Sequence, residues 1–174
     1  MQEIIRKAKE KLKGGARTNF YKLDIVFPFA TPDIDESSHI LITSTQVPAI
    51  KSGSPLTINL VYGKQVKLAS SMRIFDPFTG TIVNDVDMTY RKYFEQWIDL
   101  IQSWNDNEGA LPEEYETTVT LTLLANDGKT EKRKYKMYYC FPEVTDAISL
   151  GSDGEDIQKF NFTLHYTGIE VIDD

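Results

Sequence analysis

The fold is decided by Thr117-Thr-Val-Thr-Leu-Thr-Leu-Leu124, the turn Asn126-Asp-Gly-Lys129 and the run from Glu131 to Phe141. The first run is rich in β-branched residues and alternates in polarity, which is the pattern of a half-buried strand. The turn holds Asn, Asp and Gly, which tolerate positive φ, so it predicts a hairpin. We expect the return strand to stop at Pro142, because proline cannot donate a ladder hydrogen bond. An antiparallel β fold is therefore the first expectation.

Other stretches with a period of two residues extend this architecture on both sides of the hairpin. We expect strands at 19–27, 39–46, 56–62, 64–70, 72–75, 81–83 and 157–166. The segment 76–80 is expected to form a turn, and the acidic segment 151–156 a flexible loop. The segment 143–148 stays ambiguous. Together these patterns predict a mainly β fold, an antiparallel sandwich or barrel.

One internal segment has the period of an α-helix instead. It follows Asp87, which can serve as the N-cap, and it precedes a loop at 105–116. Its apolar residues recur at spacings of three and four, and they are Tyr90, Phe94, Trp97, Ile101 and Trp104. A stripe of this kind more often packs into the protein core than forms a binding site. We therefore expect an amphipathic helix whose packing core is this set of five residues.

The chain begins with a basic segment. Residues 2–13 are good helix formers that end at Gly14-Gly15, so a short N-terminal helix is predicted. Its apolar residues, which share one face, are Ile4, Ile5, Ala8 and Leu12. This segment is either a frayed arm or a helix that becomes ordered against a neighbouring subunit, and both alternatives remain open. We expect two parts, a basic arm or helix over 1–17 and a single β domain over 18–174.

The charge of the chain is unevenly spread. Its formal net charge is −7, yet residues 1–17 carry six basic and two acidic groups. This leaves 13 basic and 24 acidic groups in residues 18–174. A body with that balance is expected to repel nucleic-acid phosphates rather than bind them.

The sequence offers little for catalysis or cofactor binding. It lacks a Gly-rich phosphate loop, a His-x-x-x-His or Cys-x-x-Cys pair and a Gly-x-Ser-x-Gly elbow. The single cysteine, Cys140, lies in an apolar run and is expected to be a small core residue; the two histidines, His39 and His165, are not placed beside it. The acidic groups near 33–36 and 153–156 do not have the spacing of an EF-hand. We expect no enzyme activity, no cofactor and no metal.

Membrane insertion is not expected either. No apolar run approaches the roughly 20 residues that span a bilayer, and the start of the chain lacks the apolar core of a signal peptide. The expectation is a soluble protein that folds in a reducing cytoplasm.

Four stretches, in this order, resemble the tail tube proteins of contractile-tailed phages (myoviruses). They are Ala16-Arg-Thr-Asn-Phe-Tyr-Lys-Leu-Asp-Ile25, Thr43-Ser-Thr-Gln-Val-Pro-Ala49, Tyr93-Phe-Glu-Gln-Trp97 preceded by Arg91, and Phe141-Pro-Glu-Val144 followed by Ile157-Gln-Lys-Phe-Asn-Phe-Thr-Leu164. The second is followed by an extended two-strand segment that leads through 62–64 toward Phe75. Together the stretches span nearly the whole chain.

The resemblance implies an assembly rather than an activity. It implies hexameric rings stacked into the inner tube of a contractile tail, with strands of each ring lining the lumen as a continuous barrel. The implied partners are further copies of the chain, the tail sheath protein, a baseplate or tube initiator, the tail terminator, the tape measure protein and DNA in transit. The implied location is the virion tail, assembled in the cytoplasm of a bacterial host. An acidic lumen would let DNA slide during ejection.

In the resembled family, the long segment after the second strand reaches into neighbouring subunits and rings. Here the matching segment is 46–72, whose alternative is an ordinary surface hairpin of a monomer. The inter-subunit contacts expected in it are Gln46, Val47, Pro48, Ile50, Leu56, Ile58, Leu60 and Tyr62.

Three other functions remain as alternatives. The insert at 76–80 and the basic arm exceed what a minimal tube subunit needs, which leaves a tube initiator or baseplate-hub ring protein of the same fold. A secretion tube resembling the haemolysin-coregulated proteins is another. A monomeric β-barrel that binds a small ligand is the alternative from a different class, and it predicts a large apolar pocket.

Overall fold

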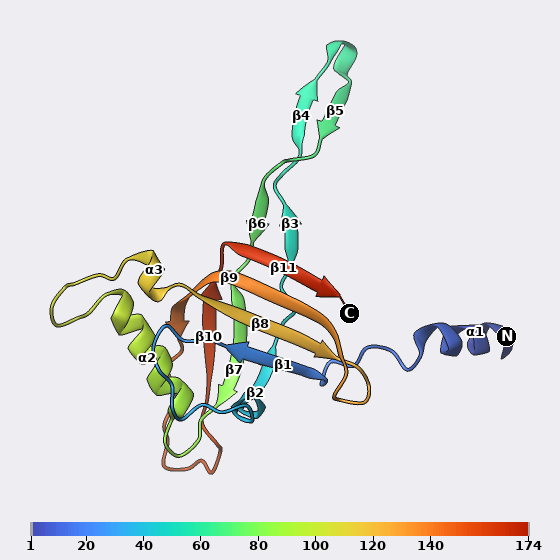
Figure 1. Cartoon of the computed structure of the whole chain (residues 1–174). Coiled ribbons are helices and arrows are strands. Elements are labelled where there is room, and N and C mark those ends of the chain that lie inside the picture. The colour runs from blue at the N-terminus through green and yellow to red at the C-terminus, as the bar shows by residue number, and fades with distance from the viewer. Residues whose placement is uncertain (1, 174) are drawn as a thin grey trace.

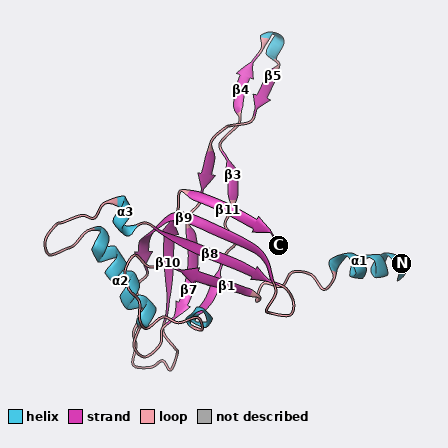
Figure 2. Ribbon diagram, viewed as in Figure 1, coloured by secondary structure: helices cyan, strands magenta, loops and turns pink. Residues whose placement is uncertain are grey.

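Strands dominate the computed structural model, which describes residues 2–173 (Figures 1 and 2). The strands are β1 (Tyr21–Ile25), β2 (Ile42–Thr45), β3 (Ile50–Ser52), β4 (Leu56–Asn59), β5 (Gln65–Leu68), β6 (Arg73–Phe75), β7 (Phe78–Val83), β8 (Thr117–Leu124), β9 (Glu131–Thr145), β10 (Lys159–His165) and β11 (Gly168–Asp173). The helices are α1 (Gln2–Leu12), α2 (Thr89–Ile101) and α3 (Pro112–Tyr115), with 3-10 turns at Ser38–Leu41 and Val61–Gly63.

Seven strands form the body of the molecule. Their order is β1-β8-β9-β10-β7-β2, with β11 paired to β9, and every pairing is antiparallel. The 15-residue β9 belongs to two layers, because its first part pairs with β8 and β11 and its end pairs with β10. Figure 1 shows the strands of one layer crossing those of the other. The predicted antiparallel sandwich is confirmed.

The core lies between these two layers and is rich in aromatic side chains. Alternate residues of β8 and β10 point inward, including Val119, Leu121, Phe160 and Phe162. Helix α2 covers one side of the sandwich (Figure 1). The ring of Phe94 lies 5.2 Å from that of Phe162 and 6.1 Å from that of Phe160. Burial of several such rings supplies much of the hydrophobic stabilisation of a domain this size.

The hairpin expected between β8 and β9 is present. Asp127 organises the turn, since its Oδ1 accepts hydrogen bonds from the backbone N–H groups of Lys129 and Thr130, both at 2.9 Å. Strand β9 does not stop at Pro142 as predicted but continues to Thr145. Strand β8 pairs with β9 only as far as Cys140, and Pro142 lies opposite Leu164 where the register of β10 shifts. The proline therefore sits at an irregular edge position, where a missing N–H is tolerated.

Two other predictions about strands were wrong. The residues 38–41 form a 3-10 turn rather than the start of a strand, because the Asp35 carboxylate accepts hydrogen bonds from Ser37 and Ser38 and bends the chain there. The predicted turn at 76–80 is shorter, since β7 already begins at Phe78. Strands β3 and β11 were not predicted. Strand β3 has only three residues, all of them exposed, and β11 is only partly buried. Neither therefore shows a clear alternation of apolar and polar residues.

Helix α2 begins one residue later and ends earlier than the sequence pattern predicted. Asp87 is not the N-cap; the carboxylate of Asp85 accepts a hydrogen bond from the backbone N–H of Thr89 at 2.8 Å and another from its hydroxyl at 2.7 Å. The helix stops at Ile101, so Trp104 lies beyond it and is 88% exposed. The inclusion of Trp104 in the packing core was therefore wrong, because the apolar spacing continues past the last helical turn.

Candidate assembly surfaces

Strands β3 to β6 form a double hairpin that projects from the body (Figure 1). Its lower part pairs β3 with β6, and its upper part pairs β4 with β5. Backbone hydrogen bonds link the parts, such as Gly53 N–H to the Met72 carbonyl at 2.8 Å. Residues of β4 and β5 are exposed on both faces, although half of them are apolar. Among residues 2–173 these strands pair only with one another. An isolated two-stranded ribbon is marginally stable in water, so a partner would stabilise this projection.

The tip of the projection presents an aromatic side chain to solvent. Tyr62 lies in the 3-10 turn at Val61–Gly63 with φ of 63° and is 97% exposed. A left-handed conformation is uncommon for a bulky residue and indicates that the turn fixes it. Leu60 N–H donates to the Lys64 carbonyl at 2.7 Å and closes this turn.

The base of the projection is fixed to the body. Gln46 Nε2 donates to the Pro77 carbonyl at 3.1 Å, and Thr45 Oγ1 donates to the Thr79 carbonyl at 3.3 Å. The rings of Phe75 and Tyr166 lie 5.3 Å apart. The projection is thus held at one end and free at the other.

The structure brings the eight expected contact residues together on this projection and at its base. Seven of them have exposed side chains, namely Gln46, Val47, Ile50, Leu56, Ile58, Leu60 and Tyr62. Pro48 is buried within the chain, so it is not available to a partner. No sequence signal separates Pro48 from its neighbours, since all belong to one mixed apolar and polar run.

Four of the five residues expected in the helix stripe are buried or half-buried. Tyr90, Phe94 and Trp97 are buried, and Ile101 is half-buried. The indole N–H of Trp97 donates to the Tyr115 carbonyl at 2.8 Å and ties α2 to α3. Burial raises the pKa of Tyr90 to about 12, so its hydroxyl stays protonated. These side chains stabilise the body rather than meet a ligand.

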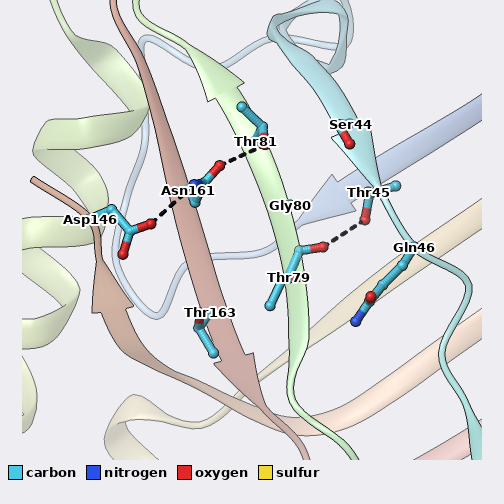
Figure 3. A pocket seen from close by; sticks show the side chains of 9 residues that line it. All are labelled: Ser44, Thr45, Gln46, Thr79, Gly80, Thr81, Asp146, Asn161 and Thr163. Carbon is cyan, nitrogen blue, oxygen red and sulfur yellow. Dashed lines mark hydrogen bonds between the residues drawn. The ribbon is translucent and has the colours of Figure 1, made fainter. Parts of the chain in front are cut away.

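The four-strand layer β2-β7-β10-β9 has a polar outer face, which the sequence analysis did not single out. A shallow hollow of about 370 Å³ lies on it (Figure 3). Its nine lining residues carry mostly hydroxyl and amide groups and are Ser44, Thr45, Gln46, Thr79, Gly80, Thr81, Asp146, Asn161 and Thr163. Alternation of Thr and Asn with Phe along β7 and β10 is the signal that could have found this face.

Hydrogen bonds between strands order this polar face. Thr81 Oγ1 donates to Asn161 Oδ1 at 2.7 Å, and Asn161 Nδ2 donates to Asp146 Oδ2 at 3.1 Å (Figure 3). Gly80 lies between Thr79 and Thr81 on β7, and a Cβ there would meet the Phe162 ring at 2.5 Å. The close approach of β7 to its neighbours therefore requires glycine.

The two ends of this layer are sheet edges. Strand β2 pairs only with β7, and the end of β9 pairs only with β10 within residues 2–173. An unpaired edge offers backbone N–H and C=O groups to another strand.

Cys140 on β9 and His165 on β10 are among the residues that were considered for chemistry. Cys140 is buried as predicted, and desolvation raises the pKa of its thiol to about 12, which keeps it protonated. His165 ends β10 and pairs with Glu143. Across residues 2–173, no cluster of three or more His, Cys, Asp or Glu could hold a metal ion. None of the helices in that range is long and apolar enough to span a membrane.

Solved structures share this fold. A chain of the sheath–tube complex of the extracellular contractile injection system PVC superposes with a TM-score of 0.67 at 12% identity, over 96% of this chain and 97% of that one. A chain of the tube-terminating cap of the anti-feeding prophage gives a TM-score of 0.63 at 13% identity, over 91% of each chain. The fold is thus that of proteins from contractile injection particles.

The sequence itself defines the family. The chain belongs to the phage tail tube protein family, whose sequence profile it matches over residues 16–169. It is also 29% identical, over 94 residues, to the tail tube protein gp19 of Enterobacteria phage T6. That match covers 53% of this chain and 58% of the relative, so the chain matches little more than half of the relative's length.

This membership confirms the resemblance derived from the four sequence motifs. The chain is therefore a member of the phage tail tube protein family, and the relative that it matches is itself a tail tube protein.

Proposed function

We propose that the chain assembles with copies of itself into hexameric rings, which stack into the inner tube of a contractile tail and form the channel for genome delivery. The observation that carries this proposal is the projecting double hairpin. On its upper part Leu56 lies opposite Leu68 and Ile58 opposite Val66, and all four side chains are exposed, which is characteristic of a protein interface. A second copy is the partner that family membership favours.

The edges of the polar layer support ring closure. Pairing of β2 in one subunit with the end of β9 in the next joins the four-strand layers into a continuous barrel. Both edges are then covered, which removes the risk of uncontrolled strand addition. Because the two edges differ, the contact is heterologous and closes by rotation.

The polar outer face of that layer suits a channel lining. Hydroxyl and amide groups predominate on it, and its formally charged groups are the acidic Glu143 and Asp146 and the basic Lys159. Such a lining gives phosphates few cations to bind, so DNA can slide. This refines the expectation of an acidic lumen into a lining of low positive charge.

The further partners follow from the same assembly. We assign the outside of the tube to the sheath protein, its ends to a baseplate or tube initiator and to a tail terminator, and its lumen to the tape measure protein and then DNA. The neighbouring structures include a sheath–tube complex, a tube and sheath terminator and a baseplate, which supports this assignment. The alternative of a ligand-binding barrel is disfavoured, because aromatic side chains fill the space between the layers.

The hairpin tip gives a direct test. Tyr62→Asn removes the aromatic ring but keeps a residue type that tolerates the left-handed backbone. We expect it to raise the protein concentration needed for tube formation at least about tenfold, since aromatic residues that anchor interfaces typically contribute about 2 kcal/mol or more and about 1.4 kcal/mol corresponds to tenfold. Sedimentation of assembled protein measures the change.

Tyr62→Phe is the matched control and is expected to assemble like the unmodified protein. Equal assembly of Tyr62→Asn would show that the hairpin tip is not an interface.

A further inference from the structure

Helix α1 has an amphipathic surface that no other part of residues 2–173 covers. All of its residues are exposed, and it projects to one side of the domain (Figure 1). Ile4, Ala8 and Leu12 are spaced by four residues and form an apolar stripe, with Ile5 beside it. Leu12 is 65% exposed. A helix of 11 residues is marginal in water by itself, so a partner for the stripe would stabilise it.

Charges frame this stripe. At about 100° per residue, Lys9 and Lys11 lie on its two sides, whereas the acidic residues lie on the opposite face of the helix. There Glu3 pairs with Lys7 at 3.0 Å and Glu10 pairs with Arg6 at 3.6 Å. Lys9 and Lys11 form no ion pair within residues 2–173. The helix therefore offers an apolar strip between two uncompensated cations.

A surface of complementary chemistry lies on the other side of the same domain. The segment 93–116 contains no basic residue and seven acidic ones, which are Glu95, Asp99, Asp106, Glu108, Glu113, Glu114 and Glu116. The end of this segment and Tyr139 of β9 border a hollow of about 500 Å³, which is lined by Leu111, Pro112, Glu113, Glu116 and Tyr139. The Leu111 side chain is 60% exposed, and Tyr139 is also exposed. Figure 1 shows α3, which borders this hollow, on the side away from α1.

We infer that α1 of one copy docks into this acidic hollow of a neighbouring copy. The apolar stripe covers Leu111 and Tyr139, while Lys9 and Lys11 lie beside Glu113 and Glu116. Because arm and hollow are on opposite sides of the domain, the contact is head-to-tail and propagates from copy to copy. The inference rests on the proposed self-assembly and adds a second contact, separate from the double hairpin.

A second acidic hollow fits the helix less well. It is lined by Glu155, Asp156, Ile157 and Lys159. The exposed fraction of its apolar side chain, Ile157, is 68%, which is similar to the 60% of Leu111. Lys159 would face the cations of α1 there and repel them. This hollow therefore serves as the matched control.

Disulfide cross-linking of assembled full-length protein tests the contact. We expect the double variant Leu12→Cys/Leu111→Cys to form intermolecular disulfides, visible as a ladder of multimers on a non-reducing gel. The native Cys140 is buried and does not compete. Leu12→Cys/Ile157→Cys is expected to form at least about tenfold less cross-linked product.

Charge reversal in the Leu12→Cys/Leu111→Cys variant gives a second test of the contact. Lys9→Glu/Lys11→Glu is expected to lower the yield of multimers about tenfold, and adding Glu113→Lys/Glu116→Lys is expected to restore it. Glu114 is left unchanged, because its carboxylate accepts the backbone N–H of Leu111 at 2.7 Å and holds the start of α3.

The outcomes separate the two proposals. Normal tubes without a Leu12–Leu111 cross-link, or with equal cross-linking at Ile157, overturn the docking of α1 and leave the tube proposal intact. Failure of the unmodified protein to form rings or tubes, alone or on baseplates, overturns both.

Discussion

Single residues set how closely the strands of the polar layer approach each other. Gly80 is the clearest case, because β7 passes over the Phe162 ring and beside the carbonyl of Ser44. A Cβ at this position would lie 2.5 Å from the ring and 2.9 Å from that oxygen. The ring is buried and the oxygen belongs to the backbone, so neither can move away easily.

Gly80→Ala is therefore expected to destabilise the protein by about 1–3 kcal/mol, the usual range for overpacking. Urea unfolding followed by tryptophan fluorescence measures the change in the free energy of unfolding. Gly151→Ala is the control, since a Cβ at Gly151 meets nothing within 4 Å. Equal stability of the two variants would mean that β7 does not run this close to β10.

Asp127 makes the stability of the β8–β9 turn depend on pH. Hydrogen bonds from Thr130 and Lys129 hold the pKa of its carboxyl at about 2, below the ordinary value of about 3.9. A lowered pKa in the folded state stabilises the fold above the unfolded pKa, and this stabilisation is lost as the pH falls through the folded pKa.

We expect Asp127→Ala to be less stable than the unmodified protein near neutral pH, with the difference shrinking between about pH 4 and about pH 2. Thermal unfolding across this range tests the prediction. A difference that stays constant to pH 2 would contradict the assigned role of the carboxylate.

At the scale of elements, the predictable features were those with a strong local signal. The β8–β9 hairpin followed from alternation and an Asn-Asp-Gly turn, and α2 followed from its aromatic spacing. Element ends were less predictable: Trp104 kept the spacing of a helix that had already ended, and Pro142 lay in a strand whose edge position is set by distant partners. The assembly surfaces depend on β3 and on the unpaired edges of β2 and β9, which only pairing across the whole chain defines.

The two tryptophans give a prediction at this scale. Trp97 is fully buried, and its indole N–H donates a hydrogen bond to the Tyr115 carbonyl. We therefore expect Trp97→Ala to lower the free energy of unfolding by about 3–5 kcal/mol. Trp104→Ala should change stability by less than about 0.5 kcal/mol, because its side chain is exposed. Chemical denaturation monitored by circular dichroism compares them. A large loss of stability in Trp104→Ala would mean that the Trp104 side chain is buried in the core.

Basic and acidic residues are concentrated in different parts of the molecule. The arm 1–17 and the projection 46–75 are basic, the latter with four basic residues and no acidic one, namely Lys51, Lys64, Lys67 and Arg73. The rest of the chain then carries nine basic and 24 acidic groups. Both projections are also apolar and exposed. An acidic body with basic projections favours contacts between unlike parts of neighbouring copies, and it predicts assembly that weakens as salt is raised.

The channel lining gives a functional prediction for the complete tail. Thr79→Lys/Thr163→Lys places cations on the polar face of β7 and β10, and we expect it to preserve tubes but slow DNA release from phage particles. Thr79→Glu/Thr163→Glu is the matched control and should release DNA at the normal rate. Time-resolved fluorescence of DNA leaving the particles measures both. Unchanged release in the lysine variant would mean that this face does not line the channel.

The central claim is that this chain builds a tube through contacts between its own copies. Negative-stain electron microscopy of the purified protein over a range of concentrations, alone and with added baseplates, tests it most directly. We expect hollow rings or tubes of uniform width with six-fold symmetry. A protein that stays monomeric at every concentration and does not extend tubes on baseplates would contradict it.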